Sequence, residues 1–171
     1  MDAVTEHVLS LRSGPPAAAL RRGGSPATAR YAYPYLAWVW QHRPYLKQPA
    51  LLFASLAAIH RDLPQRDLRV AHHLQQLARA DNGLSELSVE RRLLLAVNAD
   101  LTRMHDGMRS LLASTASQRL GIDFDDLWRL YRNWDHPDRD RRDRLRDRLL
   151  EEFYQPQHDP THAPATERPK L

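Results

Sequence analysis

Apolar residues recur at helical spacing along most of the chain, whereas the strict alternation of apolar and polar positions typical of strands is nearly absent. The sequence therefore predicts an all-α fold. Breaks in the apolar pattern, mostly at Gly and Pro, separate the expected helices. These helices cover residues 3–12, 17–22, 34–42, 49–60, 70–80, 88–97, 100–112, 123–133 and 138–154.

Several expected helices begin at a side chain that can accept hydrogen bonds from the free N–H groups of a first turn. We expect Ser88, Asp100 and Asp123 to act as such caps. The helix after Ser88 should turn Leu93, Leu94 and Val97 toward the core. The segment 51–59 has the strongest apolar pattern in the chain and should also be core.

The aromatic segment 31–40 can be interpreted in two ways. Its five aromatic side chains are Tyr31, Tyr33, Tyr35, Trp38 and Trp40. A helix this apolar is expected to be buried on most sides, with Pro34 in its first turn. The alternative is that exposed rings, Tyr31 and Tyr33 above all, stack on bases of a single strand.

The turn Asp81-Asn82-Gly83 is the predicted boundary between two packed helical bundles. Residues 1–80 form an N-terminal lobe with ten basic and four acidic side chains, a charge of +6. Residues 81–154 form a C-terminal lobe with thirteen basic and fifteen acidic side chains, a charge of −2. Residues 155–171, with four prolines and almost no apolar side chain, should be a disordered tail.

Composition narrows the function classes. The 171 residues contain no cysteine, which excludes disulfides, thiolate nucleophiles and zinc fingers. No apolar run approaches the roughly 20 residues that span a bilayer, and Asp2 and Glu6 lie where a signal peptide would be basic. We therefore expect a cytoplasmic protein without a membrane partner. Nearly all of the positive charge is arginine, which indicates either phosphate binding or a GC-rich genome.

Catalysis has no candidate constellation in the sequence. Asp123, Asp125 and Asp126 lie at an expected helix start, where carboxylates cap N–H groups more often than they bind metal. The adjacent pair His72-His73 points its rings about 100° apart on a helix, which does not suit a shared metal. We expect no cofactor, no metal and no enzymatic activity.

The charged run 138–148 looks like a nucleic-acid patch only if its aspartates are ignored. Asp138 with Arg142, Arg139 with Asp143 and Asp140 with Arg144 are i,i+4 pairs. We expect a self-compensated surface helix, with a buried stripe made by Leu145, Leu149 and Phe153.

The order of features from about Leu9 to Tyr154 resembles the CasB family, the small subunit of the type I-E CRISPR interference complex Cascade. The resemblance rests on an early Arg-Arg after a short helix, an aromatic and then an apolar helix, Glu-Arg-Arg before an apolar run and an Ala-Asp turn, an arginine before paired leucines, and an aromatic and acidic C-terminal part. The matching residues are Arg21-Arg22, Glu90 to Leu93, Ala99-Asp100, Arg109 before Leu111-Leu112, Ile122 to Phe124, Trp134 and Glu151 to Tyr154. Phe124 stands where the family usually has Trp, and Asn98 where it can have Arg.

The resemblance implies a non-enzymatic, all-α subunit for antiviral defence, which pairs with a second copy and with other Cascade subunits. In that family the subunit contacts the CRISPR RNA and the backbone of target DNA, and helps to hold the displaced non-target strand of the R-loop. The matching cations are Arg21, Arg22, Arg91, Arg92 and Arg109, and charge alone adds Arg30, Lys47 and Arg103. Helix capping by Arg21 and Arg22, and an ion pair of Arg91 within its helix, are the structural alternatives. At the level of function, the alternative is a purely structural adaptor that bridges protein subunits, and a helical nuclease is disfavoured.

Overall fold

The computed structural model of the chain describes residues 1–79, 85–114 and 120–155. In these ranges the protein is all-α, as predicted, and the sole strand-like feature is an isolated bridge between Gln65 and Ile122. The elements are α1 (Ala3–Leu11), α2 (Ala17–Arg22), the 3₁₀ turn η1 (Ala29–Ala32), α3 (Tyr33–Trp40), the 3₁₀ turn η2 (Pro44–Leu46), α4 (Lys47–Ile59), α5 (Val70–Arg79), α6 (Glu86–Val97), α7 (Leu101–Ala113), α8 (Phe124–Asn133) and α9 (Arg139–Tyr154).

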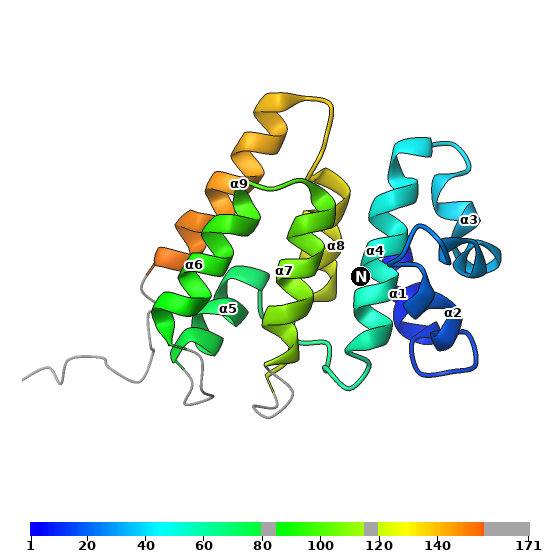
Figure 1. The fold of residues 1–171 in the computed structure, drawn as a ribbon, viewed down its shortest axis with the longest axis horizontal. Coiled ribbons are helices and arrows are strands. Elements are labelled where there is room, and N and C mark those ends of the chain that lie inside the picture. Colours follow the sequence, from blue (N-terminus) through cyan, green and yellow to red (C-terminus); the bar gives the residue numbers. More distant parts are fainter. Residues whose placement is uncertain (80–84, 115–119, 156–171) are drawn as a thin grey trace, which may run out of the picture.

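The helices form two groups that meet along α4. Figure 1 shows α1 to α3 on one side of α4, and α5 to α9 on the other. In the first group α2 packs along α4, and in the second α5 packs against α9 and α6, and α6 against α7. α4 also contacts α7 and α8, so it joins the two groups.

The predicted lobe boundary at Asp81-Asn82-Gly83 lies outside the described residues, as do residues 156–171 of the predicted tail. The helix before that turn, α5, packs with α6 and α9, which follow it in the chain. The division into residues 1–80 and 81–154 stays a prediction.

The core is built on α4. Every residue from Pro49 to Ala58 is buried. The Phe53 ring centroid lies 5.3 Å from that of Trp128 and 6.1 Å from that of Tyr131, both on α8. The strong apolar pattern of residues 51–58 thus reflects a helix that is covered on all sides, whereas Ile59, also expected in the core, is 37% exposed.

The connections beside the core are fixed by backbone hydrogen bonds. Arg66 N–H donates to the carbonyl of Ile122 (3.0 Å), and Ile122 N–H donates to the carbonyl of Pro64 (3.1 Å). The buried His73 ring bonds the carbonyl of Gly121 through Nδ1 at 2.8 Å. The segment after α4 is therefore bound to the segment before α8.

Several predicted helix starts are confirmed by their caps. The side chains of Asp100, Asp123 and Asp138 accept hydrogen bonds from the first turns of α7, α8 and α9. The predicted cap Ser88 is wrong, because the side chain of Ser85 accepts the hydrogen bond and Ser88 N–H donates it. The prediction for Leu94 is also wrong, since α6 turns Val89, Leu93 and Val97 inward and leaves Leu94 exposed.

The aromatic helix α3 corrects a further prediction. Among its residues, only Leu36 and Val39 are buried. Tyr31 and Trp38 are exposed, and Tyr33, Tyr35 and Trp40 are half-buried against the core. An aromatic ring can cover part of the core with one face while its edge stays in water, so aromatic density did not imply burial on most sides.

Candidate nucleic-acid interface

Arg21 and Arg22 are held at the end of α2 by contacts of their backbone. Ser55 of α4 donates its hydroxyl to the Arg21 carbonyl at 2.9 Å. At the next position, Gly23, an added Cβ would lie 2.9 Å from the Leu20 carbonyl oxygen and 3.1 Å from that of Leu51. The end of α2 therefore lies directly on α4, with both arginine side chains exposed.

Arg22 and Arg30 share one aromatic partner. The guanidinium of Arg22 lies 4.9 Å from the centroid of the Tyr31 ring, and that of Arg30 lies 5.7 Å from it. The Thr28 hydroxyl donates to the Arg22 carbonyl at 2.9 Å, which closes the loop between the two arginines. Tyr31 orients two cations on this surface without neutralising either of them.

Lys47 lies on a groove next to this loop. Its Nζ is 4.5 Å from the centroid of the Tyr33 ring. The groove has a volume of ≈ 480 Å³ and lies between the loop after α2, the start of α4 and the start of α7. Its lining includes Gly24, Tyr33 and Thr102, together with Tyr45 and Lys47 from the approach to α4 and its first residue.

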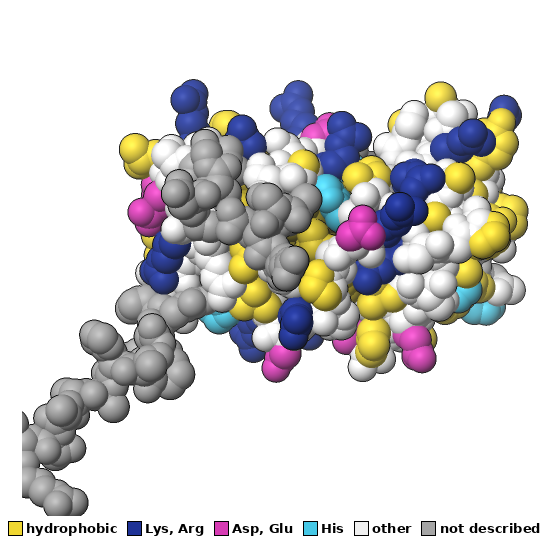
Figure 2. Space-filling view, turned by 90° about the horizontal axis from the view of Figure 1, so that it is seen from below, with side chains coloured by type: hydrophobic (Ala, Val, Ile, Leu, Met, Phe, Trp, Pro, Cys, Tyr) yellow, Lys and Arg dark blue, Asp and Glu magenta, His cyan; other side chains and the backbone are white. Residues whose placement is uncertain are grey.

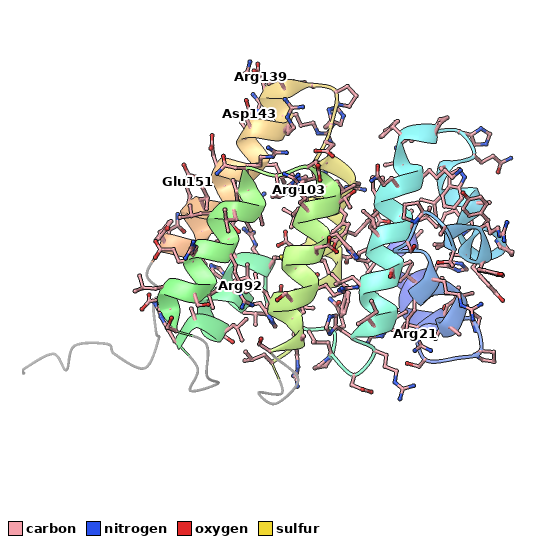
Figure 3. All side chains as sticks on the ribbon, viewed as in Figure 1. Arg21, Arg92, Arg103, Arg139, Asp143 and Glu151 are labelled. Atoms are coloured by element: carbon pink, nitrogen blue, oxygen red, sulfur yellow. The ribbon has the colours of Figure 1, made fainter. Side chains whose placement is uncertain are left out.

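The other four predicted cations lie on α6 and α7. Arg91 is exposed, and Arg92 is half-buried and donates to the Ser110 hydroxyl at 3.0 Å. Arg103 and Arg109 are both exposed; they are six residues apart, about 9 Å along the helix axis. Figure 3 shows Arg21 toward the lower end of the molecule, Arg92 about midway along α6 and Arg103 near the upper end of α7. The structure thus brings Arg22 and Arg30 together and leaves Arg103 apart from Arg92.

The eight predicted cations share one electrostatic property. Within residues 1–79, 85–114 and 120–155, none of them forms an ion pair with a carboxylate. Most arginines of α8 and α9 differ, as in the pairs Arg129–Asp126 (3.3 Å), Arg139–Asp143 (3.3 Å) and Arg148–Glu152 (2.8 Å). Figure 2 shows Lys and Arg side chains spread over both groups of helices on the face seen from below. The structure therefore contains one set of compensated arginines and another set whose charge is available to an anion.

In the described part of the chain, Arg21 and Arg22 lie in the last turn of α2, where a cation interacts favourably with the helix dipole, as the structural alternative for them expects. In that same part, no side-chain hydrogen bond links Arg21 or Arg22 to a carbonyl of the last turn of α2. Arg91 likewise makes no ion pair within α6 there.

A buried polar pair lies behind the loop that carries Arg22. His105 Nδ1 and the Tyr131 hydroxyl are 2.9 Å apart, and both residues are buried. Burial, only partly offset by the charge of Asp106, lowers the pKa of His105 to about 4. His105 is therefore neutral at pH 7, and this pair joins α7 to α8 in the core.

The acidic residues considered as metal ligands have structural partners. Asp123 caps α8, Asp125 accepts from the backbone N–H of Asp2 (2.8 Å), and Asp126 accepts from that of Val70 (3.1 Å). Over the described ranges, no three His, Asp or Glu side chains are grouped so that they could hold a metal ion.

In those same ranges, no helix is long and apolar enough to cross a bilayer.

Sequence reasoning missed Tyr45 and the groove beside it. Tyr45 is 54% exposed, and Lys47 follows it by two residues. In this part of the chain, cations lie next to or near aromatic residues in Arg30-Tyr31 and in the segment 43–47, which contains Arg43, Tyr45 and Lys47. This interleaving was the available signal, but the aromatic residues were interpreted as core.

Comparison with known proteins gives the family. The model of the family "CRISPR-associated protein Cse2" matches residues 16–154, which is most of the chain. The chain belongs to the Cse2 family. The family assignment makes it a CRISPR Cascade subunit and confirms the resemblance found in the sequence.

Solved structures share the Cse2 fold. Two structures from Thermus thermophilus, one of a CRISPR-associated protein of the Cse2 family and one of CasB, each superpose with a TM-score of 0.68 at 24% identity. Each match covers 88% of this chain and 95% of the other chain. A comparison with curated proteins gives no significant match.

Proposed function

We propose that this Cse2 subunit is a non-catalytic nucleic-acid-binding component of Cascade. Its surface arginines contact the phosphates of the CRISPR RNA and of target DNA, and they stabilise the R-loop and its displaced strand. The observation that carries the proposal is the pair Arg22 and Arg30, held by Tyr31 on an exposed loop without a carboxylate partner. Arginine without a protein counter-ion is suited to bidentate contact with phosphate.

Weak contacts are sufficient for this role. The exchange of a DNA duplex for an RNA–DNA duplex is nearly balanced in free energy, so a few backbone contacts can favour the open state. A subunit that is held in a complex also meets its nucleic acid at high effective concentration. The separate chain therefore does not need high affinity for DNA.

The test replaces Arg21 and Arg22 with alanine and measures the affinity of reconstituted Cascade for target DNA over a salt series. Loss of about two phosphate contacts should lower the slope of log K against log salt by roughly 1.8 on duplex DNA or 1.4 on a single strand. The weakening should be similar for all DNA sequences, because backbone contacts do not read bases.

The matched control also removes two positive charges, but from a surface where the arginines are paired with carboxylates. Arg139→Ala with Arg148→Ala eliminates two arginines that are paired with Asp143 and Glu152, and this variant should keep the parental slope. Circular dichroism verifies equal helix content in both variants. If the Arg21/Arg22 variant keeps both the slope and the affinity of the parent, the proposal is wrong.

One observation favours the second candidate function, that of an adaptor between protein subunits. α6 exposes Leu87 (74%), Leu94 (40%) and Leu95 (65%), and these residues lie on one side of the helix. Exposed apolar stripes of this kind occur at protein interfaces. A role in bridging predicts that Leu95→Ser reduces co-purification with Cascade subunits, or pairing with a second copy, with little dependence on salt.

A further inference from the structure

The groove beside Lys47 has the composition of a site for a flat, anionic ligand. With ≈ 480 Å³ it lies within the range of small-molecule sites, about 300–1,000 Å³. Its lining contains two tyrosines and one lysine, and none of the residues that line it is acidic. Negative charge on a ligand is therefore attracted by Lys47 and meets no repulsion from the walls.

The wall formed by the loop after α2 is fixed in place. An added Cβ at Gly24 would lie 2.6 Å from Oγ of Ser55, so the loop backbone contacts α4 directly. The same loop carries Arg22 at one end and Arg30 at the other. A strand that places a base in the groove can therefore lay its backbone across a loop flanked by two cations.

Other residues that line the groove offer an aromatic ring and a pair of polar side chains. Tyr45 is more than half exposed, and the ring of His136 lies edge-on to it at 6.5 Å. Gln48 Nε2 donates to the Thr102 hydroxyl oxygen at 3.0 Å. In the described part of the chain this leaves the amide oxygen of Gln48 and the hydroxyl hydrogen of Thr102 without a partner, so an acceptor and a donor lie side by side.

The geometry points to a pocket for one unstacked base of single-stranded nucleic acid: the base stacks on Tyr45, its edge meets Gln48 and Thr102, and Lys47 holds an adjacent phosphate. This inference rests on the proposed function and specifies its ligand as a single strand with an accessible base. Stacking and the single polar pair tolerate several bases, because every base presents a π face. The pocket adds affinity for single strands rather than sequence specificity.

The experiment compares two strands of equal length and charge, a thymidine oligonucleotide and an oligomer of abasic sites, for binding to the full-length chain. One stacked base contributes about 1–3 kcal/mol, which corresponds to roughly a 5- to 150-fold preference for the strand with bases. Tyr45→Leu should abolish most of this preference and leave the salt slope unchanged. Tyr45→Phe should retain the preference, because it keeps the ring.

Tyr154→Leu is the matched control, because Tyr154 is a similarly exposed tyrosine (53%) outside the groove. It should bind both strands as the parent does. A second variant, Lys47→Met, should lower the salt slope by roughly 0.7, the value for one phosphate on a single strand.

The outcomes separate the two proposals. If binding depends on salt but shows no preference for the strand with bases, the inference of a base pocket is wrong and the proposed function stands. The same conclusion follows if Tyr45→Leu keeps the parental preference. If neither the chain nor reconstituted Cascade binds either strand, both the pocket and the proposed function are wrong. If Tyr45→Leu instead loses other Cascade subunits on purification and keeps the base preference, the groove holds a protein side chain and the inference is wrong.

Discussion

Gly121 lies where the segment before α8 meets the segment after α4. An added Cβ would lie 1.9 Å from Cγ of Arg66 and 2.9 Å from the carbonyl oxygen of Pro64. The arginine side chain can move away, but the carbonyl belongs to backbone that bonds Ile122. The sequence indicates only a break between two helices at Gly121, whereas the structure shows that this residue permits a close approach of two segments.

Gly121→Ala is therefore expected to destabilise the fold by about 1–3 kcal/mol, the usual cost of forcing extra atoms into a packed site. Urea unfolding measures this change. Gly107→Ala is the control, since its Cβ would meet nothing closer than Cβ of Ala96 at 3.6 Å. On α7 that change should instead stabilise by about 0.5–1 kcal/mol. Equal stability of Gly121→Ala and the parent would show that the Pro64 backbone moves freely.

Trp134 is fully buried at the end of α8, as its spacing seven residues after Leu127 predicts. Its indole N–H donates to the Ala99 carbonyl at 3.0 Å, and the Arg146 guanidinium lies 4.9 Å from its ring centroid. Trp134→Ala should cost roughly 3–5 kcal/mol of unfolding free energy. Trp134→Phe should cost less, because it keeps most of the apolar volume. A stable Trp134→Ala protein in chemical denaturation would contradict this packing role.

His105 makes stability depend on pH. Its pKa is about 4 in the native state because of burial, against an ordinary value of 6.5. Between these values the unfolded chain binds more protons than the native one, so stability is lost as the pH falls from about 6.5 to about 4.

At about 1.4 kcal/mol per pKa unit, this residue accounts for up to about 3 kcal/mol at pH 4. His105→Gln should therefore show a shallower fall of unfolding free energy between pH 7 and pH 4 than the parent. Tyr131→Phe, which removes the hydroxyl partner but keeps the histidine, should retain a steep fall. Parallel curves for the parent and His105→Gln would rule out this origin of the pH dependence.

At the scale of elements, local signals predicted most of the helices. α2 has its predicted bounds, and α7, α8 and α9 begin after the aspartates that cap them. These signals act within a single turn, so they are visible in the sequence. α4 starts at Lys47 rather than Pro49 because the 3₁₀ turn η2 leads directly into it.

α3 and α6 show that local sequence patterns do not suffice to predict which side chains are buried. The aromatic pattern of α3 suggests a helix buried on most sides, and the spacing in α6 suggests that Leu94 faces the core, but burial depends on which neighbours reach each residue. α3 buries two side chains on the first group, and the exposed Trp38 packs its ring edge-to-face with His7 at 5.4 Å. α6 buries one face, including Leu93, against α5 and α7, and leaves Leu94 and Leu95 exposed. The candidate site was missed for the same reason, because the groove forms from segments far apart in the chain.

α9 confirms the interpretation of its charged run. Leu149 and Phe153 are buried and Leu145 packs against the core. Of the three predicted i,i+4 pairs, only Arg139–Asp143 forms an ion pair within the described residues. Asp138 caps the helix instead, and the predicted pair of Asp140 with Arg144 is wrong. The helix is thus a surface element with internal charge compensation, unlike the surface around Arg22.

At the scale of the whole molecule, the packed body includes Gln155. The Gln75 side-chain amide donates to the carbonyls of Phe153 (2.9 Å) and Gln155 (2.8 Å). Removal of residues 156–171, which carry four prolines and almost no apolar side chain, should change the melting temperature by no more than a few degrees. Truncation after Leu150, which removes the buried Phe153, should lower it far more. A large drop in the shorter truncation would show that these residues dock on the body.

The position of α4 between the two groups has a mechanical consequence. A hinge between the groups would have to separate Phe53 from Trp128 and Tyr131, and so open the centre of the core. Close-packed interiors resist such opening, so the groups should move as one rigid body. The spacing between Arg22 on one group and Arg91 on the other is then constant. Under the proposed function, a nucleic-acid strand that contacts both arginines would have to adopt a conformation that matches this fixed distance.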